Sequence, residues 1–147
     1  MNRIPPPVIA LTNIIIFSLS TLLIPKFQFT GQTILSLLIG MEGIIIILLA
    51  INLFRRNNTT IHPFKAHETT RLITSGIFTF TRNPMYLGLS SIQVAFGIYL
   101  GAFISIVLIP AFVIYITQKQ ILYEEKILEK EFGNSYIEYS KNVRRWI

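Results

Sequence analysis

Cysteine and aspartate are both missing from this chain of 147 residues. The lack of cysteine excludes disulfide bonds, thiolate metal sites and cysteine nucleophiles. Charged residues are also scarce, at 14% of the chain, against about 25% in soluble domains. The length suits a single domain. An apolar fraction of 52% and a mean hydropathy of +0.57 favour a membrane protein over a soluble one.

Several sequence motifs are absent as well. The chain has no GxGxxG, no GxxxxGK[ST] and no GxSxG pattern, so no soluble nucleotide-binding or hydrolase domain is expected. His62 and His67 have neither Cys, Asp nor an HExxH motif to complete a ligand set, and we predict no metal site. No small-x-small cleavage site follows the first apolar segment, which is interpreted as a membrane span and not as a cleaved signal.

Long apolar segments predict an all-α integral membrane bundle, built as one domain over residues 1–147. A polar connection, 55–83, is long enough to cover a site, and 119–147 is predicted to be a cytoplasmic helical tail. We place about four transmembrane helices at residues 8–24, 33–54, 84–98 and 102–118.

The last two spans are derived from one apolar stretch, residues 84–117. As a single helix this stretch would extend about 51 Å, well beyond the hydrocarbon core of ~30 Å. A helical hairpin that turns at residues 97–101 explains the length better. Gly97 and Gly101 also have the GxxxG spacing of a helix-packing motif, which is the alternative.

The tail is amphipathic, and its last helix is expected to lie at the membrane interface. The fourth span should continue as a helix to Gly133, which suits the position after a helix C-terminus. Ser135 and Glu138 then have the spacing of a capping box that opens the final helix.

The basic residues predict the orientation. With four spans, 12 of the 13 Lys and Arg residues fall on one side, and only Lys26 falls on the other. By the positive-inside rule that side is cytoplasmic, so both termini and the site should face the cytoplasm, and we expect a bacterial inner-membrane location. Attraction to anionic membrane lipids explains the net charge of +6, and no nucleic-acid partner is needed.

An anion site is predicted where the third span begins. Asn83 suits a helix N-cap and Pro84 the first helical position. The free N–H groups of that first turn favour an anion, and the guanidinium of Arg82 stands beside them. Alternatively, Arg82 only sets topology or binds lipid headgroups, and Tyr86 belongs to an aromatic belt.

Two acidic features accompany the spans. Glu124 and Glu125 can accept from hydroxyls or pair with an ammonium group, or they can belong to an ordinary solvated helix face. Glu42 lies mid-span, where an ionisable group usually faces the bundle or a cavity. Its candidate partners are Arg82 or, in the protonated form, a hydrogen-bonding group of a neighbouring helix. Glu42 is either a functional residue or a neutral buried glutamic acid that ties helices together.

These pieces, in this order, resemble the isoprenylcysteine carboxyl methyltransferase and phospholipid methyltransferase superfamily, in the form of a short bacterial-type member. The resemblance covers roughly residues 55–147. Asn83 stands where the eukaryotic branch has His. The motifs that carry the resemblance lie at residues 59–64, 74–78, 81–88, 124–125, 132–139 and 144–146.

The resemblance implies an integral membrane methyltransferase that uses S-adenosyl-L-methionine. Arg82 would bind the methionyl carboxylate, and Glu124 and Glu125 would bind the ribose or the ammonium group. His62 would lie in the loop that closes over the cofactor. The implied cofactor-binding residues are Arg82, Asn83, Pro84, Tyr86, Gly88, Glu124, Glu125 and His62.

The acceptor would be a lipophilic or membrane-partitioned carboxylate, thiol or amine. The sequence identifies neither a catalytic base nor the oligomeric state. Phospholipid N-methylation is the alternative activity, and a non-catalytic membrane protein that retains the fold is the alternative class.

Overall fold

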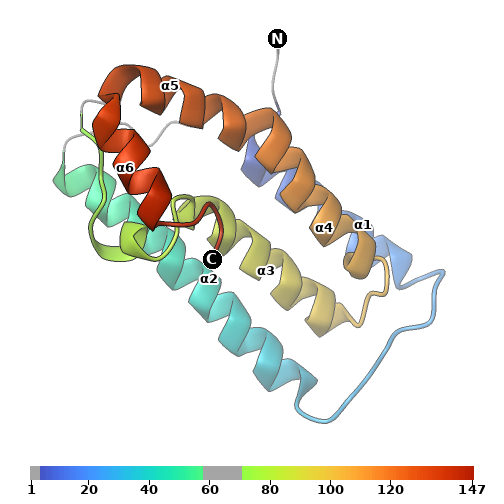
Figure 1. The fold of residues 1–147 in the computed structure, drawn as a ribbon. Helices are drawn as coiled ribbons and strands as arrows, with labels where there is room; N and C mark the ends of the chain where they lie inside the picture. The colour runs from blue at the N-terminus through green and yellow to red at the C-terminus, as the bar shows by residue number, and fades with distance from the viewer. Residues whose placement is uncertain (1–3, 58–70) are drawn as a thin grey trace.

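The computed structural model describes residues 4–57 and 71–147, which form helices joined by turns and no strand. The all-α prediction is confirmed for this part of the chain. Short helix η2 (Gly76–Thr79) lies between α2 (Gln32–Arg56) and the end of the molecule formed by α5 (Leu122–Phe132) and α6 (Asn134–Asn142) (Figure 1). The main helices are α1 (Pro6–Ser20), α2 (Gln32–Arg56), α3 (Pro84–Leu100), α4 (Ser105–Ile116), α5 (Leu122–Phe132) and α6 (Asn134–Asn142).

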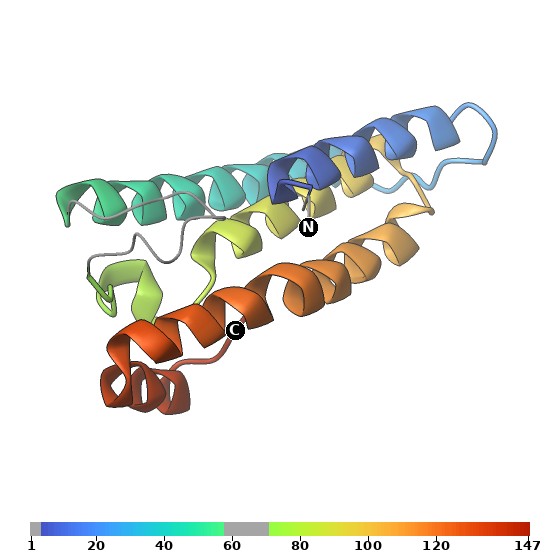
Figure 2. The ribbon, with the colours of Figure 1, turned by 90° about the horizontal axis from the view of Figure 1, so that it is seen from above.

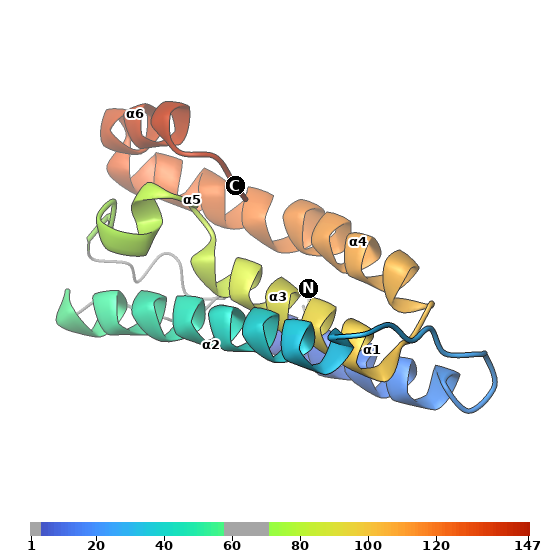
Figure 3. The same cartoon turned by 90° about the horizontal axis from the view of Figure 1, so that it is seen from below.

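Helix α3 is the centre of the bundle and packs on α1, α2 and α4. Helix α4 continues through a five-residue π-helical turn, η3 (Thr117–Ile121), directly into α5. Seen from above, α1, α2 and α3 run together while the α4–α5 rod forms a separate flank (Figure 2). The opposite view shows η2 between α2 and α5, at the end where α6 folds back (Figure 3).

Two of the described helices are long and apolar enough to cross a bilayer, α2 and the continuous segment Ser105–Phe132. Helices α1 and α3 have 15 and 17 residues, or about 22 and 26 Å of helix, somewhat less than the hydrocarbon core of ~30 Å. Two candidate spans are therefore shown, and four crossings with a cytoplasmic site remain a prediction.

In the hairpin between α3 and α4, one of the two glycines forms the turn and the other allows the helices to pack closely. Gly101, at φ 65°, ends α3 in the left-handed conformation that glycine adopts without strain. Gly97 lies inside α3, where a methyl group would come within 2.7 Å of the Ser105 Cβ atom. The chain thus reverses after Leu100, slightly later than predicted, and Gly97 serves the packing of α3 on α4.

The predicted capping box at Ser135 is wrong. Gly133, at φ 52°, occupies the N-cap position of α6, and its carbonyl accepts hydrogen bonds from the backbone N–H groups of Tyr136 and Ile137. Helix α6 consequently begins at Asn134, which places Ser135 within the first turn, and no side chain caps the helix.

The prediction that Glu42 faces the bundle is also wrong, because the structure places it on the exposed side of α2. The buried stripe of α2 consists of Ser36, Gly43, Ile46 and Ala50. The predicted partner, Arg82, instead pairs with Glu125. Since α2 is apolar all round, its sequence could not show which side packs on α3.

A buried pair of amides joins α1 to α3. Asn13 Nδ2 donates to Gln93 Oε1 at 2.8 Å, and both residues are at most 8% exposed. Buried amides need such partners, because leaving one unpaired in an apolar interior is costly.

We expect Gln93→Leu to destabilise the bundle by about 1–2 kcal/mol, because it leaves the Asn13 amide buried without its best acceptor. Thermal unfolding in detergent measures this loss. The double variant Asn13→Leu/Gln93→Leu should recover part of it, since both polar groups are then gone. Equal losses in the single and double variants would contradict this account.

Candidate functional site

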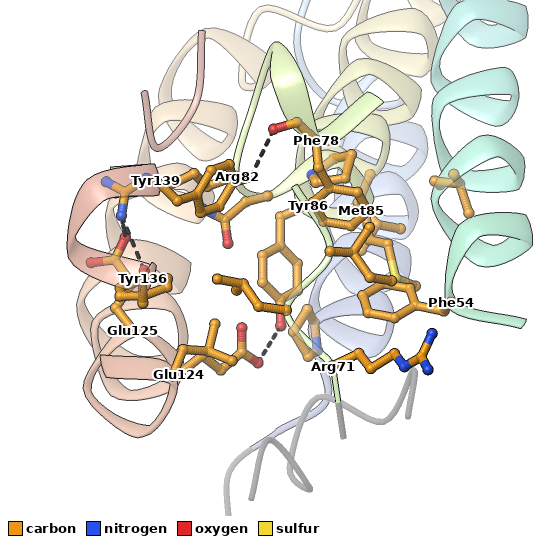
Figure 4. A pocket seen from close by; sticks show the side chains of 18 of the residues that line it. Phe54, Arg71, Phe78, Arg82, Met85, Tyr86, Glu124, Glu125, Tyr136 and Tyr139 are labelled. Carbon is orange, nitrogen blue, oxygen red and sulfur yellow. Dashed lines mark hydrogen bonds and ion pairs between the residues drawn. The ribbon is translucent and has the colours of Figure 1, made fainter. Parts of the chain in front are cut away.

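A cavity of about 270 Å³ opens at the end of the bundle where α1 begins and α2 ends (Figure 4). Its walls come from segments far apart in the chain: the start of α1, α2, residues 71–89, α5 and α6. One end is polar and is formed by Arg82, Asn83, Tyr86, Glu124, Glu125, Tyr136 and Tyr139. The remaining wall is largely apolar and includes Ile47, Phe54, Ile73, Phe78, Met85 and Leu89.

Glu125 organises the polar end by binding two arginines. Its Oε1 lies 3.0 Å from Arg82 Nη1, and the Glu125 and Arg82 side chains are only 15% and 13% exposed. Arg145 donates through Nε and Nη2 to the two carboxylate oxygens, at 2.9 and 2.8 Å. Two parallel hydrogen bonds of this kind fix the orientation of a carboxylate. They also raise the pKa of Arg145, which stays charged.

Two tyrosines of α6 complete this cluster. The Tyr136 hydroxyl accepts a hydrogen bond from Arg82 Nη1 at 3.1 Å. Burial first, and then the charge of Glu125, raise the pKa of Tyr136. Tyr139 donates to the Phe78 carbonyl at 2.7 Å, and burial raises its pKa too. Both phenols therefore remain neutral at physiological pH and provide hydrogen bonds without adding charge.

Glu124 is held from two sides. The Tyr86 hydroxyl donates to its Oε1 at 2.7 Å, and Gln120 Nε2 donates to the same oxygen at 2.6 Å. Gln120 lies in η3, the π-helical turn between α4 and α5. Turns of this kind change the direction in which the following side chains point and are frequent at functional sites.

The segment after α6 joins the two sides of the cavity. The backbone carbonyl of Arg144 accepts from the Arg82 N–H at 3.0 Å, and that of Arg145 accepts from Asn83 Nδ2 at 2.9 Å. Trp146 Nε1 donates to Thr117 Oγ1 in η3, at 3.1 Å. The residues just before α3 and the α4–α5 rod are thereby held at a fixed separation.

Sequence reasoning placed Arg145 and Trp146 on an interfacial helix and did not include them in the site. Helix α6 ends at Asn142, and Val143 is extended, so the chain turns back toward α3. Their place beside residues 81–83 is a long-range contact that no local pattern shows. The one available signal was that residues 144–146 belong to the motifs carrying the family resemblance.

The structure brings most of the predicted site residues together. Those that line the cavity are Arg82, Asn83, Pro84, Tyr86, Glu124 and Glu125. Asn83 occupies the N-cap position of α3, but the predicted cap by its side chain is not formed. Its amide instead donates to the backbone carbonyl of Arg145. His62 lies outside the described residues.

Gly88 is absent from the cavity wall and instead faces α2. A methyl group there would lie 2.6 Å from the Gly43 carbonyl oxygen and 2.5 Å from Ile47 Cγ1. The resemblance implies that Gly88 binds the cofactor, but in the structure the group that approaches Gly88 closely belongs to the neighbouring helix α2.

The donors and acceptors at the polar end suit a ligand that carries charges of both signs. Arg82 Nε is buried and has no hydrogen-bond partner among the described residues, so it is available to an anionic group. The two carboxylates can accept from an ammonium group or from hydroxyls. Within residues 4–57 and 71–147, no group of three or more His, Cys, Asp or Glu side chains could hold a metal ion.

Comparison with known proteins matches residues 31–135 to the family model described as phospholipid methyltransferase. A Haemophilus influenzae protein described as uncharacterized is 40% identical over 63 residues, which are 43% of this chain and all of that protein. Protein-S-isoprenylcysteine O-methyltransferase of Schizosaccharomyces pombe is 32% identical over 79 residues, or 54% of this chain. The match spans only 34% of the yeast protein. No solved structure matches.

Proposed function

The chain belongs to the phospholipid methyltransferase family, and from this premise we propose that it is an S-adenosylmethionine-dependent methyltransferase of the membrane. Its acceptor would be a lipophilic or membrane-partitioned small molecule or lipid. The observation that carries the proposal is the convergence of Arg82, Glu124 and Glu125 on one cavity from separate helical segments.

The residues of the polar end fit this cofactor. The unpartnered, buried Nε of Arg82 is suited to the methionyl carboxylate. Glu125 and Glu124 would accept hydrogen bonds from the ammonium group or from the ribose hydroxyls. Tyr86 and Tyr136 already fix Glu124 and Arg82, so these groups are oriented before a ligand arrives.

Bound S-adenosylmethionine supplies an electrophilic methyl group. The chain would contribute alignment and the exclusion of water, which are the main demands of a direct methyl transfer. Arg82 and Glu125 would fix the polar end of the cofactor, while the apolar wall would exclude water from the reacting atoms.

The apolar wall supports a lipophilic acceptor. Ile47 and Phe54 of α2 and Met85 and Leu89 of α3 all contribute apolar side chains to the cavity wall. An acceptor could enter beside α2 from the bilayer while the cofactor enters from the cytoplasm. We further propose that this end of the bundle faces the cytoplasm at a bacterial inner membrane, as the distribution of basic residues indicates.

A calorimetric titration of the purified protein with S-adenosylhomocysteine tests the cofactor assignment. We expect saturable binding, and the absence of binding would favour a non-catalytic protein that retains the fold. Labelled cofactor should then transfer its methyl group into a native lipid extract. Label released as methanol by mild alkali would identify a carboxyl methyl ester, whereas phospholipid label that stays non-volatile and remains on the amine headgroup after alkali would identify N-methylation.

A further inference from the structure

The exposed face of α2 carries a seam of regularly spaced residues that the proposed function does not use. Their spacing alternates between three and four residues, which is the a/d pattern of helices that pack side by side. All of them are exposed in the monomer. The seam consists of Leu35, Leu38, Glu42, Ile45, Leu49 and Asn52.

Two members of the seam are polar, and the other four are apolar. Glu42 lies ten residues after the start of α2, near its middle, and Asn52 lies close to its end. Lipid tails offer no hydrogen-bond partner to Glu42. Ionisable side chains within membrane spans accordingly almost always face another protein segment or a cavity. Residues 4–57 and 71–147 of the monomer provide Glu42 with neither, because the side chain is exposed and lies outside the cavity wall.

We propose that this seam is a homodimer interface in which α2 packs in parallel, and in register, against α2 of a second copy. A two-fold axis brings each seam residue opposite its own copy. Glu42 then meets Glu42 and Asn52 meets Asn52, each at equal depth. An amide both donates and accepts, and so does a protonated carboxyl group, so each pair can hydrogen-bond to itself.

A second copy suits the seam better than an unrelated partner does. Any other helix would have to present polar groups at both depths, ten residues apart, whereas an identical helix provides them automatically. Polar residues at such positions fix the register and the number of helices in helical assemblies. The cavity takes Ile47 and Phe54 from α2, and neither belongs to the seam, so pairing leaves the cavity open.

The chain contains no cysteine, so single cysteines can be introduced without background. Leu38→Cys and Ile45→Cys place a thiol in the seam. Leu37→Cys and Ile44→Cys are matched controls at nearly the same depth, on the neighbouring stripe of the same helix. Leu37 and Leu38 are each 60% exposed, and Ile44 and Ile45 are each 51% exposed.

We expect mild oxidation of full-length protein in native membranes to give at least about fivefold more disulfide-linked dimer from the seam variants than from their controls. Excess cysteine-free chain should reduce that yield. Equal yields from seam and control positions would overturn the proposal, as would cross-linking of the seam variants to a different protein.

The role of Glu42 is tested in the Ile45→Cys background. Glu42→Leu should lower the dimer yield at least about threefold, while Glu42→Gln, which still hydrogen-bonds, should retain it. Unchanged yield with Glu42→Leu would reject the pairing of Glu42. Thermal unfolding of the Glu42→Leu variant shows whether the monomer is intact, and wild-type stability is expected because this side chain has no role in the bundle core.

Discussion

Replacing Arg82 by alanine is expected to weaken S-adenosylhomocysteine binding at least about tenfold, the loss that follows when a charged hydrogen-bond donor is removed from a site. The variant loses both the buried, unpartnered Nε and the Nη1 group that holds Tyr136. Glu125 keeps its two hydrogen bonds from Arg145, so no carboxylate is left without a partner. Calorimetric titration measures the affinity, and thermal unfolding should show an intact bundle.

Arg144→Ala is the matched control for this prediction. Arg144 is exposed and adds no side chain to the cavity wall, so its replacement removes the same charge nearby and should leave affinity unchanged. Arg82→Lys keeps the charge but loses the planar fork, and its affinity should fall between the other two. If the Arg82→Ala protein bound S-adenosylhomocysteine with wild-type affinity, Arg82 would not be a cofactor-binding residue.

Replacing Gly88 by alanine is expected to cost the protein about 3 kcal/mol of stability, at the upper end for overpacking a helix interface. The added methyl group would lie 2.6 Å from the Gly43 carbonyl oxygen and 2.5 Å from Ile47. A backbone carbonyl cannot rotate away as a side-chain end can, so α2 and α3 would have to separate. The melting temperature in detergent reports the loss.

Gly40→Ala is the control for Gly88→Ala. The same two helices meet at Gly40, but there an added methyl group would lie 3.4 Å from Ala95 Cβ, which is an ordinary contact. We expect its stability to stay within about 0.5 kcal/mol of wild type. If Gly88→Ala melted normally but lost S-adenosylhomocysteine binding, Gly88 would contact the cofactor, as its place in the family motif implies.

The elements that could be predicted from sequence are those specified locally. Pro84 begins α3, as its fixed backbone angle requires, and Gly133 follows the last residue of α5. The 34-residue apolar stretch could be divided because its length exceeds a bilayer. The family resemblance was confirmed, and it singled out Arg82, Glu124 and Glu125, which local chemistry alone could not separate from an ordinary charged surface.

What could not be predicted depends on long-range contacts. The inward side of α2 is selected by Gly43 meeting Gly88, and an apolar helix gives no sign of that choice, so Glu42 was placed on the wrong side. Arg145 was missed because it lies beyond the end of α6 and its partner, Glu125, lies 20 residues earlier, on α5. The side chain of Asn83 was expected to cap α3, but its amide donates to the Arg145 carbonyl instead. That carbonyl lies in a turn after α6, and no sequence pattern shows that the turn comes back to Asn83.

The attachment of residues 144–146 has a consequence for how the molecule responds to heat. This stretch is held by a small number of hydrogen bonds, one ion pair and the packing of a single side chain, Trp146, on the apolar cluster, whereas α3 packs on α1, α2 and α4. Weakly attached segments detach in a cooperative step of their own, below the temperature at which the remainder melts. Ligand recognition should therefore fail on warming while the α1–α4 bundle is still folded, and cooling should restore it.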